Sequence, residues 1–90
     1  MTKSSFEIVW TNPVKKELAA LERQAQKRII AAVELLRLNP RPSKAIRLVA
    51  PEPKFRVRVG DYRVIYQIEN KQLIIVVIAV GHRKEVYRNL

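Results

Sequence analysis

The sequence predicts an α+β fold, in which an N-terminal strand and a helical hairpin precede a four-stranded, mainly antiparallel sheet with the helices packed on one of its faces. Two observations favour this class. Apolar residues recur at helical spacing from Val14 to Leu36, whereas after Pro40 they alternate or form short runs, as they do in strands. With 90 residues, the chain is long enough for one hydrophobic core and too short for two, so residues 1–90 are expected to form a single domain.

The first half of the chain predicts a strand followed by two helices. Residues 6–10 read as the strand, after which Asn12 is expected to cap a helix and Pro13 to occupy its first turn. The helical pattern continues to Asn39 and Pro40. An unbroken helix of this length would measure roughly 40 Å, whereas a compact domain of this size is about 30 Å across. We therefore expect a bend within residues 21–26.

The second half predicts four strands. Prolines flank Ile46 to Val49 on both sides, so this segment is expected to be an edge strand. Two strands of a hairpin follow. The run from Leu73 to Val80 is wholly apolar, which is typical of a strand covered on both faces and central in its sheet, and Gly81 is expected to end it. The tail from His82 to Leu90 has room for a short helix at most.

The hairpin is predicted at residues 55–66, with its turn at Gly60 and Asp61. Glycine at the first central position of a two-residue loop suits a type II′ turn. A longer loop would slip the register by one residue and move Val57 and Val59 into solvent. In the two-residue register, one face carries only apolar and aromatic side chains: Phe55, Val57, Val59, Tyr62, Val64 and Tyr66.

The other face of the hairpin carries Arg56, Arg58 and Arg63, and the register places Arg58 opposite Arg63. Like charges at opposed positions destabilise a strand pair. The sequence therefore predicts an anionic guest on this face, although a row of arginines is also compatible with a solvated outer face.

The charge of the whole chain agrees with a polyanionic partner. It contains 18 Lys and Arg against 8 Asp and Glu, which gives 18 − 8 = +10. Residues 41–90 hold eleven of the basic side chains and four of the acidic ones, so the excess lies in the half that contains the hairpin. A basic excess clustered in this way is typical of nucleic-acid binding.

Other classes of function are disfavoured by what the sequence lacks. It has no cysteine, which removes disulfides, thiolate zinc sites and cysteine nucleophiles. It shows no metal-ligand spacing and no glycine-rich phosphate loop, so neither metal nor cofactor is expected. The longest apolar run is far shorter than the roughly 20 residues that span a bilayer, and the N-terminus does not read as a signal peptide. We expect a soluble cytoplasmic protein with no membrane partner.

Three segments carry a family resemblance: residues 55–58 (FRVR), residues 60–66 (GDYRVIY) and residues 80–87 (VGHRKEVY). With them the chain resembles the RelE family of bacterial toxins, within the RelE/ParE superfamily, over nearly its whole length. The resemblance implies a RelE-like fold and a ribosome-dependent endoribonuclease that cuts messenger RNA in the decoding site without a metal. It also implies four partners: the ribosome, messenger RNA, ribosomal RNA and a cognate antitoxin that blocks the toxin.

Carried over by position, the resemblance implies five catalytic residues: Arg56, Arg58, Arg63, Arg83 and Tyr87. Better-known members have lysines at the two hairpin positions 56 and 58. Arginine binds phosphate oxygens bidentately, yet its pKa, above about 12, makes it a poor base. The base that activates the 2′-hydroxyl is therefore open between Tyr87, His82 and a group of the ribosome.

Basic residues near this set are expected to add contacts to RNA: Lys54, Lys84 and Arg88. Two of the residues considered for catalysis also have a structural interpretation. His82 reads as a loop histidine without a chemical task. Tyr87 reads as an aromatic residue that anchors the C-terminal tail on the sheet. Four basic residues of the helical hairpin read either as its exposed face or as contacts to ribosomal RNA: Lys15, Lys16, Lys27 and Arg28.

Two other functions fit the same fold. A ParE-like toxin inhibits DNA gyrase by protein contact and cuts nothing, although such proteins typically lack the basic set. A catalytically weakened member binds RNA without cleaving it, because arginines have replaced its lysines.

Overall fold

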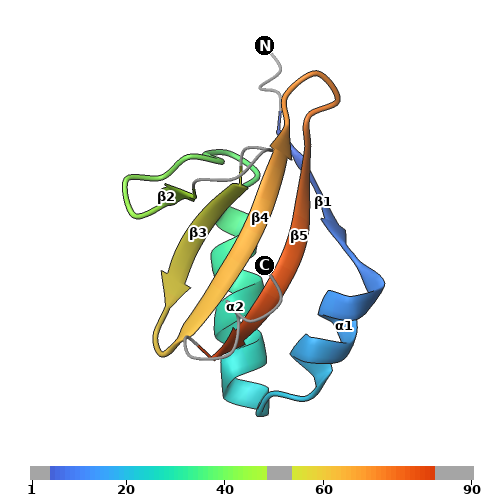
Figure 1. Cartoon of the computed structure of the whole chain (residues 1–90), viewed down its shortest axis with the longest axis vertical. Helices are drawn as coiled ribbons and strands as arrows, with labels where there is room; N and C mark the ends of the chain where they lie inside the picture. Colours follow the sequence, from blue (N-terminus) through green and yellow to red (C-terminus); the bar gives the residue numbers. More distant parts are fainter. Residues whose placement is uncertain (1–4, 49–53, 83–90) are drawn as a thin grey trace.

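The computed structural model describes residues 5–48 and 54–82 and contains two helices and five strands in these ranges (Figure 1). The elements are β1 (Glu7–Trp10), α1 (Asn12–Ala19), α2 (Arg23–Leu35), β2 (Ile46–Leu48), β3 (Lys54–Val59), β4 (Tyr62–Glu69) and β5 (Ile74–His82). This is the α+β class that the sequence predicts. No helix in the described ranges has both the length and the apolar character needed to cross a membrane.

All five strands form one sheet in the order β1-β5-β4-β3-β2. The pairs β2/β3, β3/β4 and β4/β5 are antiparallel, as the prediction of four sequential strands requires. The prediction counted four strands in the sheet, after the N-terminal strand and the helical hairpin. In the structure β1 also joins the sheet, at its edge, and runs parallel to β5. The chain between these two strands holds both helices and the other three strands, which is long enough for a parallel connection.

The start of α1 differs from the prediction. Thr11, not Asn12, is the N-cap residue, and it makes no side-chain cap hydrogen bond. Its hydroxyl Oγ1 instead donates to the carbonyl of Val77 at 3.1 Å. This hydrogen bond ties the end of β1 to the neighbouring strand β5. Because Val77 lies 66 residues further along the chain, sequence patterns near Thr11 do not predict it. Pro13 lies in the first turn, as predicted.

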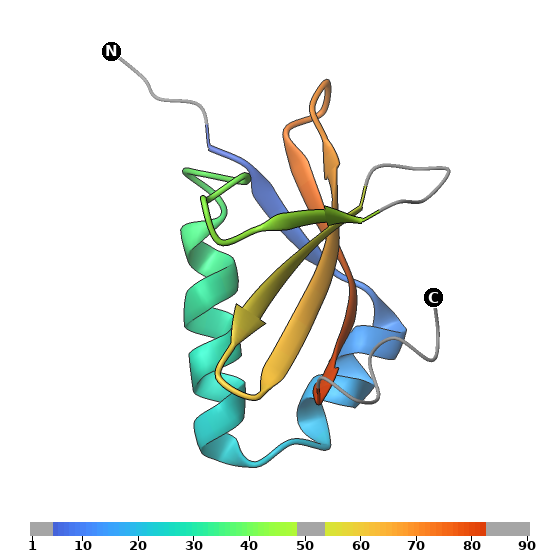
Figure 2. The same ribbon diagram turned by 60° about the vertical axis from the view of Figure 1, so that its left-hand side comes forward.

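The predicted bend between the helices is confirmed. α1 ends at Ala19 and α2 begins at Arg23. The side chain of Gln26 spans the bend, since its Nε2 donates to the carbonyl of Leu21 at 2.8 Å. In Figure 2 the chain turns sharply between the two helices, which therefore pack as separate elements.

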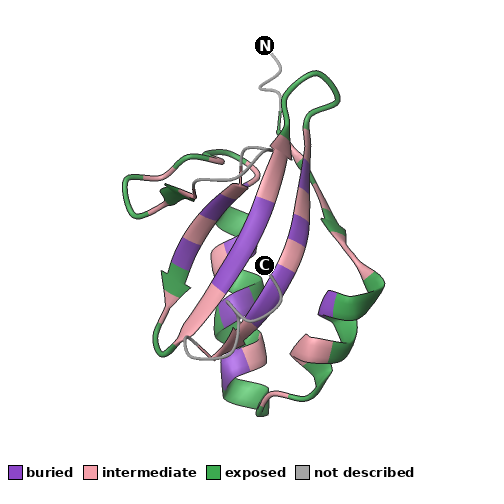
Figure 3. Cartoon of the chain, viewed as in Figure 1, coloured by how far each residue is buried: buried purple, intermediate pink, exposed green. Residues whose placement is uncertain are grey.

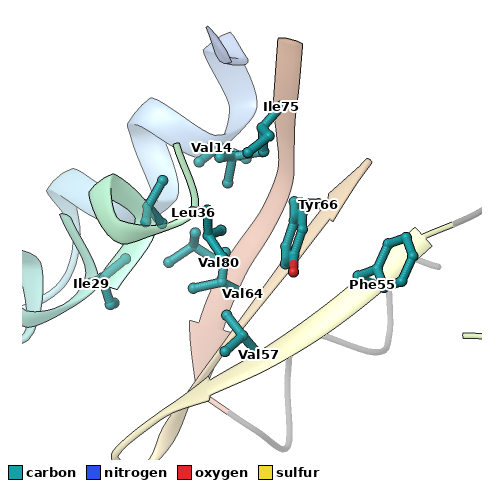
Figure 4. Packing of buried hydrophobic residues seen from close by; sticks show 11 residues of the cluster. Val14, Ile29, Leu36, Phe55, Val57, Val64, Tyr66, Ile75 and Val80 are labelled. Atoms are coloured by element: carbon teal, nitrogen blue, oxygen red, sulfur yellow. The ribbon is translucent and has the colours of Figure 1, made fainter. Parts of the chain in front are cut away.

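The core lies between the helices and one face of the sheet (Figure 3). Figure 4 shows Val14 of α1 and Ile29 of α2 on the same side of the sheet as Val64 and Val80. All the apolar residues predicted for the inner face of the hairpin belong to this cluster or pack against it. The prediction of an inner apolar face and an outer arginine face is confirmed.

Tyr66 is the largest fully buried side chain of the core. Its ring stacks on Phe55 with centroids 5.8 Å apart, and its hydroxyl donates to the carbonyl of Pro40 at 2.7 Å. Burial raises the pKa of Tyr66 to about 12. The phenol therefore joins the sheet to the segment that follows α2.

Strand β5 runs to His82, so the prediction that Gly81 ends it is wrong. An irregularity in the register opposite Ile65 and Tyr66 shifts the pairing by one residue along β5. Because of this bulge, Val77 and Val80 both face the core although three positions separate them. Gly81 then lies opposite Arg63, on the outer face of the sheet.

Candidate functional site

The two strands of the hairpin place the arginines as the sequence predicts. β3 and β4 meet at Gly60 and Asp61, and Arg58 pairs directly with Arg63. Gly60 has a φ of 62°. Asp61 does not have a positive φ, which agrees with a type II′ turn. Glycine is needed here because this backbone conformation is strained for residues with a Cβ.

The outer face of the hairpin is hollowed. A cavity of about 530 Å³, which we call the basic hollow, is lined by Lys44, Ile46, Arg56, Arg58, Gly60 and Arg63. All three predicted arginines of the hairpin line it. The basic hollow has four cationic side chains and no carboxylate among its lining residues, so it favours an anion electrostatically.

Lys44 is a member of the basic hollow that the sequence reasoning missed. It lies in the connection that precedes β2, and β2 brings it to the site because Ile46 pairs with Arg56 of β3. Pairing the predicted edge strand with the hairpin in antiparallel register would have pointed to it.

Arg58 and Arg63 are held differently. Arg58 is exposed, and its Nε donates to the carbonyl of Gly60 at 2.8 Å, which fixes its side chain near the turn. Arg63 is half-buried, and its Nε and Nη1 are shielded from solvent without an acceptor in the part of the chain that the structure describes. Its cross-strand neighbours are Arg58 and Gly81, neither of which offers a side-chain acceptor.

Among the residues that the structure describes, these shielded donors have no compensating acceptor. A buried donor left without a partner costs about 1–3 kcal/mol, and more when it is charged. An anion that enters the basic hollow and reaches this guanidinium would make strong charge-assisted hydrogen bonds. The geometry therefore fits an anionic group such as a phosphate.

Lys54 and His82 lie away from the basic hollow. Lys54 is the first residue of β3 and pairs with Gln67, two positions before Arg56. His82 ends β5 opposite Tyr62, and the two rings meet edge to face with centroids 6.0 Å apart. Because cross-strand partners share a face, His82 lies on the inner face with Tyr62, not on the outer face with Arg63.

The remaining predicted residues lie outside the described residues: Arg83, Lys84, Tyr87 and Arg88. Among the residues that are described, no three His, Cys, Asp or Glu side chains gather where they could hold a metal ion.

Solved structures share this fold. The chain superimposes on an archaeal RelE from a RelE-RelB complex of Pyrococcus horikoshii with a TM-score of 0.79 and 26% identity, covering 90% of this chain and 98% of the other. A free variant of the Escherichia coli toxin RelE matches with a TM-score of 0.74 and 23% identity, covering 93% and 92% of the two chains. The fold is thus that of RelE toxins.

Sequence comparison gives the family. A family model described as the ParE toxin of type II toxin-antitoxin systems, parDE, matches residues 8–87. A curated Escherichia coli protein described as RelE-like toxin is 29% identical over 80 residues, which cover 88% of this chain and 84% of that protein. The chain belongs to the RelE/ParE superfamily of toxins from type II toxin-antitoxin systems.

Proposed function

We propose that this toxin is a ribosome-dependent endoribonuclease that cleaves messenger RNA in the decoding site. The observation that carries the proposal is the basic hollow, where Arg58 and Arg63 oppose each other with Arg56 beside them and no carboxylate in the lining. Opposed guanidinium groups are unfavourable unless an anion lies between them. RNA supplies such an anion at every linkage.

In cleavage by the RNA's own 2′-hydroxyl, a bond from the 2′-oxygen to phosphorus forms and the bond to the 5′-oxygen breaks, and this leaving oxygen takes up a proton from an acid or from water. Cations stabilise the pentacovalent phosphorane as negative charge develops. Arg63 contacts the scissile phosphate in this proposal, and Arg56, Arg58 and Lys44 contact it or the flanking phosphates. Arg83 and Tyr87 remain in the proposed set by family resemblance. Lys54, Lys84 and Arg88 are proposed contacts to RNA outside the basic hollow.

The proton from the 2′-hydroxyl goes to Tyr87 or to a group of the ribosome in this proposal. His82 is not assigned this role, because it shares the inner face with Tyr62. None of the arginines serves as base, because a guanidinium group is not deprotonated in proteins. Orientation of the RNA by the ribosome is then a large part of the rate acceleration.

A cognate antitoxin is the proposed protein partner. Structures that match this chain include RelE-RelB complexes from Pyrococcus horikoshii and from Methanococcus jannaschii. The net charge of +10 favours an acidic or amphipathic antitoxin that covers the arginine face.

Inhibition of DNA gyrase is the second candidate, because the matching family model describes ParE toxins. This activity needs a protein contact and no catalytic group. It gives no reason for opposed arginines in the basic hollow, which is why we place it second.

The test is a reconstituted translation assay in which breaks in ribosome-bound messenger RNA are mapped, run beside a gyrase supercoiling assay. We expect codon-specific breaks with the wild-type chain and their loss in Arg63→Ala. The matched control is Arg47→Ala, an exposed arginine of β2 that does not line the basic hollow and should cleave normally. Intact messenger RNA together with inhibited gyrase would overturn the nuclease proposal, whereas Arg63-dependent RNA binding without breaks would indicate the weakened member.

A further inference from the structure

A second cavity lies on the other side of the hairpin turn. It has a volume of about 460 Å³ and is lined by Glu22, Gln24, Ala25, Arg28, Arg58, Val59, Gly60, Asp61 and Tyr62. We call it the turn hollow. Arg58 and Gly60 also line the basic hollow, so the two cavities share a wall at the hairpin turn.

The turn hollow is formed by two elements that are distant in sequence. Arg28 projects from α2 to the hairpin, where its Nη1 lies 3.8 Å from the point that a Cβ on Gly60 would occupy. Arg58 reaches the same glycine from the other side through its hydrogen bond to the Gly60 carbonyl. Two guanidinium groups therefore flank the turn: Arg28 lines the turn hollow, and Arg58 lines both cavities.

Four polar side chains of the turn hollow have no partner among the residues that the structure describes. Within the described ranges, the side chains of Glu22, Gln24, Arg28 and Asp61 make no hydrogen bond and no ion pair, although two carboxylates and two guanidinium groups line the same cavity. All four are exposed. Donors and acceptors are thus both available to a ligand, together with the ring of Tyr62.

The turn hollow offers both hydrogen-bond donors and acceptors, whereas the basic hollow offers cations and no carboxylate. The lining of the turn hollow therefore suits a nucleobase better than a phosphate. Carboxylates accept from exocyclic amino groups of bases, and arginine donates to base acceptors. Aromatic rings supply a surface on which an unstacked base lies. The volume is within the range of about 300–1,000 Å³ that is usual for small-ligand sites.

We propose that the turn hollow is a subsite for the nucleotide that flanks the phosphate in the basic hollow, and that it gives the toxin a base preference. The proposal rests on the proposed RNA-binding function. A strand whose phosphate lies between Arg58 and Arg63 passes Gly60 to place the neighbouring base beside Arg28. Because Glu22 and Asp61 are acceptors, bases with an exocyclic amino group bind better than uracil.

The experiment measures binding alone. Four dye-labelled pentaribonucleotides, identical except for the base at the central position and 2′-O-methylated to prevent cleavage, are titrated with the chain in low salt and followed by fluorescence anisotropy. A cytosine, adenine or guanine is expected to bind about five-fold to ten-fold more tightly than uracil, at the lower end of the discrimination usual for such contacts because the site is exposed.

Variants assign the preference to the turn hollow. The double variant Glu22→Gln, Asp61→Asn should bring the four affinities within two-fold of one another. Arg28→Gln removes a donor that all four bases can use, so it should weaken binding of all four. Lys27→Gln is the matched control, because Lys27 precedes Arg28 on α2, is equally exposed and lines neither cavity. It should keep the wild-type preference.

Failure of the subsite is distinguishable from failure of the proposed function. Tight binding that requires Arg63 but is indifferent to the base, or a preference that survives all the variants, would overturn the subsite alone. Equally weak affinities that Arg63→Ala does not change would overturn RNA binding at the basic hollow, and the subsite with it.

Discussion

Replacing Arg63 with methionine should make the fold more stable while abolishing the proposed activity. Methionine retains a flexible apolar side chain but removes the charge and the two shielded donors, Nε and Nη1, that have no acceptor among the described residues. It also removes the repulsion between Arg63 and Arg58, which carry like charges at paired positions of β4 and β3.

The magnitude follows from these two losses. Each shielded donor without a partner costs about 1–3 kcal/mol, and an unfavourable cross-strand pair costs up to about 1 kcal/mol. Since Arg63 is only half-buried, its charge is partly screened, and we expect less than the sum of these costs, a gain of about 1–3 kcal/mol in the free energy of unfolding. For a domain of this size, each kcal/mol raises Tm by roughly 4–8 °C.

The assay is urea unfolding at neutral pH, with midpoint and slope compared between variant and wild type. The control is Arg37→Met, because Arg37 is an arginine whose donors are used. It donates to Glu34 at 2.6 Å and 3.3 Å and to the carbonyl of Phe6 at 3.2 Å, and the hydrogen bond from Arg37 lowers the pKa of the Glu34 carboxyl. Arg37→Met should lower stability. If Arg63→Met lowered stability by as much, the idea of an unsatisfied guanidinium awaiting an anion would be refuted.

Three further outcomes are expected. Burial raises the pKa of Tyr66 to about 12, so its neutral form contributes stability that is complete below about pH 10 and is lost as the pH rises through 12, by about 3 kcal/mol in all. Urea unfolding measured over this pH range should show the loss in the wild-type chain and not in Tyr66→Phe. RNA affinity should fall with salt with a log-log slope of about −0.7 for each phosphate contact, and Arg56→Ala should make the slope less steep by about that amount; a flat response would contradict phosphate binding. Gly60→Ala should destabilise the fold by more than about 1 kcal/mol, because alanine is strained at a φ of 62°. It should also weaken RNA binding, because the Gly60 carbonyl holds the side chain of Arg58. Calorimetry checks the stability and a binding titration checks the affinity, and unchanged values would contradict the role of the turn.

Much of the site could be predicted from sequence because it is built by short-range rules. Strand alternation and a two-residue turn at Gly60 place Arg56, Arg58 and Arg63 on one face of the sheet. Both the alternation and the turn depend only on neighbouring residues along the chain. The bend between the helices was predictable for a similar reason, since the length of the apolar pattern exceeds the width of the domain.

Other features were decided by contacts between distant residues. The hydroxyl of Thr11, the N-cap residue of α1, has its partner on β5, and β1 pairs in parallel with that same strand. The bulge in β5 decides that Gly81 lies beside Arg63 and that His82 faces inward. No local pattern contains this information.

The class of fold, the inner and outer faces of the hairpin and the cationic character of its outer face all follow from the order of the residues along the chain. Two features depend on how separate elements pack: Lys44 completes the basic hollow, and Arg28 reaches the turn at Gly60. The physical reason is range: alternation and turn preference act over a few residues, whereas a cavity exists only when separate elements pack and leave space between them.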